Sequence, residues 1–133
     1  MRWLVFSLVV FCCSCTDPAR QVQVHAADGV AQSANAALPL LVSHYRLEGI
    51  TAIEAAQTRE EALASVAKVK ETWKPVWDAW EALRTAQDAW ATGLETDGDL
   101  GALLPKLQAA WCALLAVWPT ELPTPLAPLQ CPA

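Results

Sequence analysis

Residues 58–95 decide the fold, and they read TREEALASVAKVKETWKPVWDAWEALRTAQDAWATGLE. The first four letters form a capping box, in which the Thr58 hydroxyl accepts from the backbone N–H of Glu61 and the Glu61 carboxylate accepts in return. Apolar side chains then recur every three or four positions, which predicts one long amphipathic helix from Arg59 to about Glu95. Its apolar stripe comprises Val66, Val69, Trp73, Val76 or Trp77, Trp80, Leu83, Trp90 and Leu94. Pro75 is expected to bend this helix, because proline lacks a backbone donor.

A second long helix is expected before this stretch, over residues 20–57. Its apolar face is marked at helical spacing by Leu38, Val42, Tyr45, Ala52 and Ala56. Pro39 is expected to kink this helix or to restart it, because proline removes a backbone donor and crowds the preceding turn.

A shorter third helix is expected after Glu95. Gly98 should take the left-handed conformation that ends the preceding helix, and Asp99 should cap the next one. Pro119 should terminate it. The apolar stripe of this helix comprises Leu100, Leu103, Leu107, Trp111, Leu114 and Trp118.

The C-terminal residues 119–133 read PTELPTPLAPLQCPA and contain five prolines. Such a segment is expected to be an extended, semi-rigid tail without a core of its own. β-Branched residues are too scattered elsewhere to form strands. The sequence therefore predicts an all-α protein, an antiparallel helical bundle of two long helices and one shorter helix over residues 15–118, followed by the Pro-rich tail.

The N-terminus reads MRWLVFSLVVFCCSC. Its apolar run is about half the 20 residues that a spanning helix needs, which is typical of a signal-peptide h-region. In having Cys15 directly after the small residue Ser14, the chain resembles bacterial lipoprotein precursors. Cys12 and Cys13 are alternative lipidation sites, but the small residue Ser14, before Cys15, is a better residue to cut after than Phe11, before Cys12. Residues 1–14 would then be the signal peptide.

The resemblance implies a lipid anchor and a location in the cell envelope. The Cys15 thiol would be diacylated, the signal would be cut just before it, and the new amine would be acylated. Thr16 stands where an Asp would signal retention in the inner membrane, which implies an outer-membrane lipoprotein facing the periplasm. The membrane is thus the expected partner through the lipid anchor, together with a candidate protein partner in the envelope.

Cleavage before Cys15 would leave two unmodified cysteines, Cys112 and Cys131. Disulfides form and persist in oxidising compartments, so these two are predicted to pair and to tie the tail back. The alternative is two unrelated free thiols, with Cys112 a small core residue. A loop of this size would stabilise the fold by about 3 kcal/mol in the chain-entropy model.

Several function classes have no support in the sequence. The chain carries a net charge of −5 and has no basic run, so a nucleic-acid partner is not expected. His25 and His44 are far apart and have no cysteine or carboxylate at ligand spacing, so no metal or cofactor is predicted. Asp97 and Asp99 suit a helix-linking turn better than a calcium loop. No nucleophile–base pair is present, and an enzyme is not expected.

The tryptophans are the unusual feature, and Trp73, Trp77 and Trp80 form the candidate ligand or partner surface. At helical spacing such residues are mostly core, where each buries about 150–250 Å². The alternative is an aromatic cleft at the Pro75 bend.

The stretch WKPVWDAW, with a later WC, also resembles small uncharacterised lipoproteins of high-GC bacteria and their prophages, which implies no activity. The expected function is a structural or protein-interaction module, in the setting of a phage-borne envelope or lysis accessory; a small-ligand-binding lipoprotein is the alternative.

Overall fold

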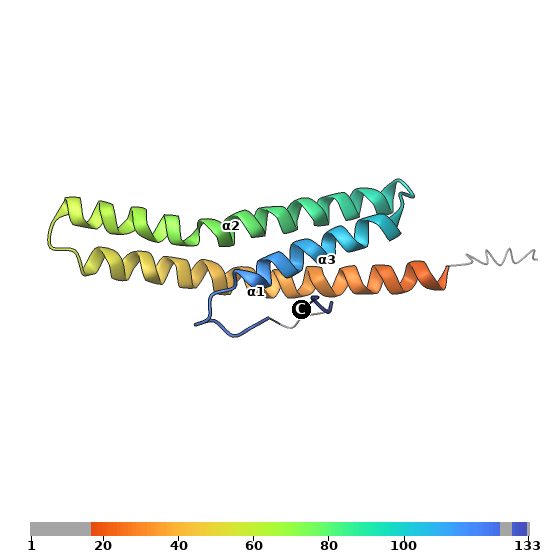
Figure 1. Ribbon diagram of the computed structural model, residues 1–133, viewed down its shortest axis with the longest axis horizontal. Helices are drawn as coiled ribbons and strands as arrows, with labels where there is room; N and C mark the ends of the chain where they lie inside the picture. The colour runs from red at the N-terminus through yellow and green to blue at the C-terminus, as the bar shows by residue number, and fades with distance from the viewer. Residues whose placement is uncertain (1–16, 126–128, 133) are drawn as a thin grey trace, which may run out of the picture.

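The computed structural model describes residues 17–125 and 129–132, and in those ranges it contains three helices and no strand. Helix α1 comprises Pro18–Glu54, α2 comprises Arg59–Glu95, and α3 comprises Leu100–Ala116. Helices α1 and α2 form a long antiparallel hairpin, and α3 turns back along the half that contains the start of α1 and the end of α2 (Figure 1). The predicted all-α bundle is confirmed. The predicted signal peptide, residues 1–14, and Cys15 lie outside the described residues.

The start of α2 follows the prediction. The backbone N–H of Glu61 donates to Thr58 Oγ1 over 3.1 Å, and Glu61 Oε2 accepts from the backbone N–H of Thr58 over 3.3 Å. Both halves of the capping box are thus present. The same Oε2 accepts from the backbone N–H of Gln57 over 2.9 Å. Because Gln57 already belongs to this cap, α1 ends at Glu54 rather than at Gln57.

The turn between α2 and α3 corrects one prediction. Asp97, not Gly98, has the left-handed conformation, with φ 52°, and no described glycine has positive φ. The backbone N–H of Gly98 donates to the Gly93 carbonyl over 2.7 Å, which is the longer of the two hydrogen bonds of a Schellman motif. Space is tight at Gly98, since an added Cβ would lie 3.1 Å from the Cα of Gly93. Asp99 caps α3 as predicted, accepting from the backbone N–H of Ala102 over 3.2 Å.

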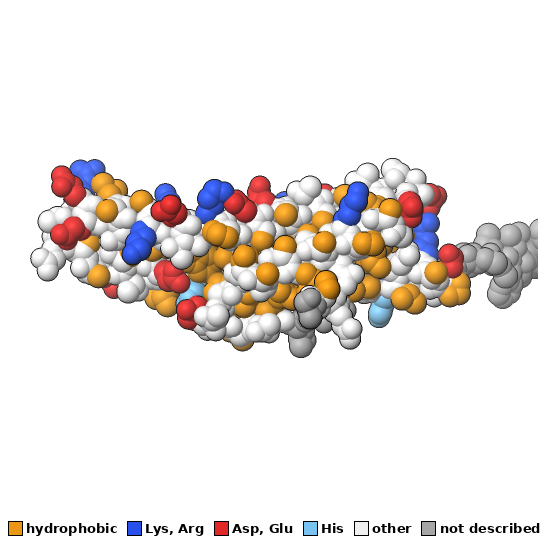
Figure 2. All heavy atoms as spheres, viewed as in Figure 1, with side chains coloured by type: hydrophobic (Ala, Val, Ile, Leu, Met, Phe, Trp, Pro, Cys, Tyr) orange, Lys and Arg blue, Asp and Glu red, His pale blue; other side chains and the backbone are white. Residues whose placement is uncertain are grey.

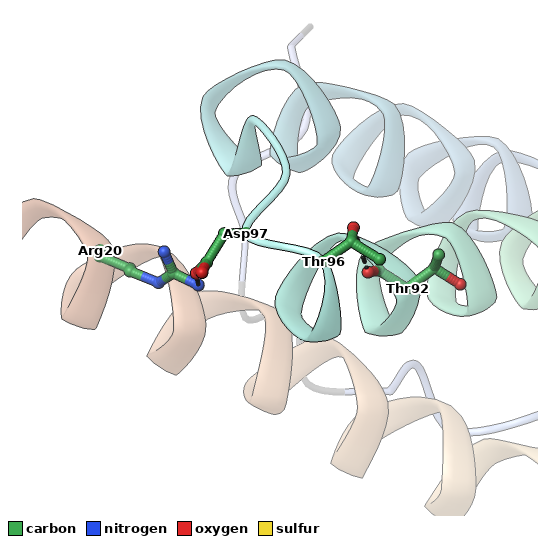
Figure 3. A network of polar contacts seen from close by, with 4 residues as sticks. All are labelled: Arg20, Thr92, Thr96 and Asp97. Atoms are coloured by element: carbon green, nitrogen blue, oxygen red, sulfur yellow. Dashed lines mark hydrogen bonds and ion pairs between the residues drawn. The ribbon is translucent and has the colours of Figure 1, made fainter.

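The same turn is connected to the start of α1. Arg20 Nη2 lies 3.1 Å from Asp97 Oδ1 (Figure 3). Nearby, the Thr96 hydroxyl donates to the carbonyl of Thr92 over 2.8 Å. The Asp97 side chain is largely exposed, so this ion pair contributes at most about 1 kcal/mol.

Each helix contains one internal proline, and none of the three interrupts its helix. Pro39 lies within α1, Pro75 within α2 and Pro105 within α3. All three are exposed. On an exposed side, the carbonyl that loses its backbone donor can bond to water, so the helix continues at a reduced cost. Of the two outcomes expected at Pro39, a kink or a restart, the restart does not occur, because α1 is continuous from Pro18 to Glu54.

The core is one cluster contributed by all three helices. The face of α1 that is buried differs from the predicted one, because Leu38, Val42 and Tyr45 are only half-buried. In α3, Trp118 lies beyond the helix end, since the residue before a proline avoids the helical conformation and Pro119 follows it. The buried side chains of the cluster are Ala27, Val30, Ala34, Leu41, Trp73, Val76, Leu83, Trp90, Leu100, Leu107, Trp111 and Leu114.

The C-terminal segment lies against the bundle. Cys112 of α3 and Cys131 form a disulfide, with their Cα atoms 5.5 Å apart. Residues 123–125 border a hollow beside Ala37 and Leu40 of α1, and the described part of the tail runs along α1 in Figure 1. Leu122 and Leu129 pack against the core. The tail is thus held by the predicted disulfide to α3 and by the packing of Leu122 and Leu129 against the core.

Candidate functional site

Trp73 is the centre of the tryptophan cluster, and it connects α2 to α1. Its side chain is 3% exposed. The indole Nε1–H donates to Glu48 Oε2 of α1 over 2.7 Å. Nε2 of His44, one turn earlier on α1, lies 3.1 Å from the other carboxylate oxygen of Glu48. A hydrogen bond to a charged acceptor is stronger than one between neutral groups, so the bond from the Trp73 indole to the Glu48 carboxylate fixes the orientation of Trp73 against α1.

The rings of Tyr45, Trp73 and Trp77 contact one another between α1 and α2. Tyr45 of α1 meets Trp73 edge to face, with centroids 5.5 Å apart, and meets Trp77 in the same manner at 5.6 Å. Trp73 and Trp77 themselves lie 5.8 Å apart. Such edge-to-face pairs stabilise by about 0.5–1.5 kcal/mol each beyond the area that they bury. Trp77 and Trp80 are half-buried against the core.

The contacts of these rings favour packing over a ligand cleft. Trp73 has its polar atom satisfied within the protein, and its ring is covered. The predicted core position Trp80 is less buried than Trp73, which lies seven residues, or about two turns, earlier. Hollows lie elsewhere, along the first turns of α1, between α3 and Cys131, and between α1 and residues 123–125.

The partners of Trp73 on α1, Glu48 and His44, are not among the predicted site residues. His44 does have a carboxylate at helical spacing, because Glu48 follows it by four residues. The spacing of His44 and Glu48 is thus visible in the sequence, but the Glu48 carboxylate accepts from an indole N–H instead of binding a metal ion. His25 is exposed on the first turns of α1, away from this pair. Among residues 17–125 and 129–132, no group of three or more side chains is placed to hold a metal ion.

A second feature lies at the end of the hairpin that α3 does not reach (Figure 1). Three large apolar side chains of α1 are exposed there: Leu47 at 59%, Ile50 at 53% and Ile53 at 51%. Leu63, on the first turns of α2, is 62% exposed. A shorter third helix leaves this end as a two-helix segment, which has fewer faces to cover its apolar residues.

Charge is unevenly distributed over the surface. Figure 2 shows charged side chains along α2 and at the hairpin end, whereas the band over α3 is mainly hydrophobic or uncharged. The sequence explains this, because Lys106 is the one charged residue of α3. The apolar residues of the hairpin end therefore lie among charges of both signs, a pattern typical of a protein-contact surface with a polar rim.

Within the described parts of the chain, no helix is both long enough and apolar enough to cross a bilayer. Comparison of the chain with protein-family models, with curated proteins and with solved structures gave no match.

Proposed function

We propose that this chain is a lipid-anchored protein of the bacterial cell envelope that acts as a structural or protein-interaction module. The observation that carries the interaction role is the exposed apolar surface at the uncovered end of the hairpin, formed by Leu47, Ile50 and Ile53. Isolated exposed apolar residues are ordinary, but a contiguous group rimmed by charges is typical of a contact surface.

The proposed location in the cell envelope is supported by the sequence. Ser14–Cys15 has the arrangement of a lipidation site, and Thr16 suits transport to the outer membrane. A paired Cys112 and Cys131 is compatible with an oxidising compartment such as the periplasm. A phage-borne envelope or lysis accessory is the setting that the resemblance to prophage lipoproteins favours. The small-ligand alternative is weaker, because Trp73 is covered and hydrogen-bonded within the protein.

The anchor is tested by metabolic labelling of the full chain with a fatty-acid analogue in a Gram-negative host. We expect labelling of the parent protein and its loss in Cys15→Ser, with Cys13→Ser as the matched control that keeps the label. Labelling that persists in Cys15→Ser and disappears in Cys13→Ser would move the anchor to Cys13. An absence of labelling in the parent would contradict the anchor altogether.

The interaction role is tested in the same cells with a photoreactive amino acid. We expect covalent adducts from position 47, at the hairpin end, and none from position 28, an exposed site on the half of α1 that α3 accompanies. The absence of any adduct from position 47 in the folded, membrane-associated protein would contradict the proposed role of this surface.

A further inference from the structure

The last turns of α1 are apolar on two opposite sides. Leu41 is fully buried and points into the bundle. Ile50 follows it by nine residues, about two and a half helical turns, so its side chain points away from the bundle. Leu47 and Ile53 lie three residues on either side of Ile50 and flank it on this outward face. A helix that is apolar on opposite sides normally has a neighbour on each.

The outward face of α1 is apolar only near its end. Toward the N-terminus, the same face carries exposed polar side chains at His25, Asp28, Gln32 and Asn35. The change from polar to apolar occurs where α3 no longer accompanies the hairpin (Figure 1). The exposed face around Ile50 is therefore a local feature of the hairpin end.

The sequence around Ile50 is self-complementary when two copies run in opposite directions. Arg46 precedes Ile50 by four residues, and Glu54 follows it by four. An antiparallel pair with its twofold axis at Ile50 would place Arg46 against the partner's Glu54, and Leu47 against the partner's Ile53. A parallel pair would place Arg46 against Arg46 and Glu54 against Glu54, which is unfavourable.

We propose that residues 46–54 of α1 bind the same segment of a second copy of this chain, antiparallel about a twofold axis at Ile50. This inference rests on the proposed function, because it names the partner of the exposed hairpin end. The contact covers only about two and a half helical turns, so the dimer is a weak one. The antiparallel pairing puts the two N-termini at opposite ends of the dimer, so with both hairpins lying along one membrane both copies can be anchored to it, which would raise their effective concentration and offset that weakness.

Charge reversal tests the pairing directly. Within one chain, Arg46 and Glu54 are eight residues apart, about 12 Å along the helix axis, which exceeds the distance over which exposed charges interact at physiological salt. Neither takes part in an ion pair among the described residues. Any mutual rescue between these two positions must therefore come from contact between two copies.

The measurement is sedimentation velocity of the full chain in a density-matched non-ionic detergent. We expect a reversible monomer–dimer equilibrium for the parent protein. Arg46→Glu and Glu54→Arg should each weaken the dimer by about tenfold, because two symmetric attractions become repulsions. The double variant Arg46→Glu/Glu54→Arg should restore it. Ile50→Glu should abolish the dimer, whereas Leu63→Glu, at a similarly exposed site on α2, should leave it unchanged.

The outcomes separate this inference from the proposed function. A parent chain that stays monomeric, or a double variant that associates no better than the single variants, overturns the second-copy assignment. So does a dimer that survives Ile50→Glu while far-UV circular dichroism remains that of the parent. If position 47 then still forms adducts in cells with a different protein, the interaction role stands and only the identity of the partner is wrong.

Discussion

At the scale of single residues, the contribution of a tryptophan depends on its burial and on its polar atom. Trp73 is covered and hydrogen-bonded to Glu48, whereas Trp80 is half-buried. We expect Trp73→Ala to lower the free energy of unfolding by about 3–5 kcal/mol and Trp80→Ala to lower it by less. Urea unfolding followed by far-UV circular dichroism measures both. A larger loss for Trp80→Ala would contradict the observed order of burial.

Trp73→Phe separates the hydrogen bond from the packing. Phenylalanine keeps most of the apolar contact but leaves Glu48 without its indole donor. Because the Glu48 side chain is partly accessible to water, we expect a loss of only about 1 kcal/mol. Glu48→Gln, which keeps an acceptor for the indole, is the matched control and should cost less than Glu48→Ala in the same unfolding experiment.

Two glycines give opposite expectations for the same substitution. Gly49 lies inside α1, and an added Cβ would have no atom within 4 Å. Gly49→Ala should therefore raise the free energy of unfolding by about 0.5–1 kcal/mol, the difference in helix propensity. Gly98→Ala should lower it, because the added Cβ would crowd the backbone of Gly93 at 3.1 Å. Thermal melts of both variants against the parent protein test the pair, and a stabilising Gly98→Ala would contradict the close approach.

At the scale of elements, the sequence predicted what local patterns encode. The bounds of α2 and the cap of α3 agree with the prediction, because a capping box and an Asp cap act within a few residues. The prediction of a left-handed Gly98 is wrong, because the hydrogen bond from the Gly98 N–H to the Gly93 carbonyl places the preceding residue, Asp97, in that conformation. The link between Trp73 and Glu48 joins two helices, and no single-helix pattern reveals it.

The internal prolines are the main departure from local rules. Proline inside a helix costs about 3 kcal/mol relative to alanine, although it also restricts the unfolded chain by up to about 1 kcal/mol. We therefore expect Pro39→Ala, at an exposed position in continuous helix, to raise the free energy of unfolding by about 2 kcal/mol. Urea unfolding is the measurement. A destabilised variant with parent-like helicity would indicate that the fold needs the proline there.

At the scale of the whole molecule, the unequal lengths of the helices determine which part of the hairpin is covered and which part is exposed. Helix α3 has 17 residues, whereas α1 and α2 have 37 each. One half of the hairpin therefore has a three-helix core reinforced by the tail, and the other half presents the outward face around Ile50. The predicted anchor would precede the covered half. The part of the hairpin that α3 covers and the candidate contact surface thus lie at opposite ends of the same hairpin.

Releasing the tail from α3, by removing the disulfide that joins them, tests this division. The Cys112–Cys131 disulfide closes a loop for which the chain-entropy model gives about 3 kcal/mol. We expect Cys131→Ser to lower the free energy of unfolding by roughly that amount, while helicity is kept, because the three helices pack through a core that does not depend on the disulfide. Hydrogen exchange should rise in α1 around residues 32–40, beside the tail, and stay unchanged around Ile50. The double variant Cys112→Ala/Cys131→Ser controls for the free thiol. Unfolding of the whole bundle, or equal changes in exchange at both ends of α1, would show that the two halves are not independent.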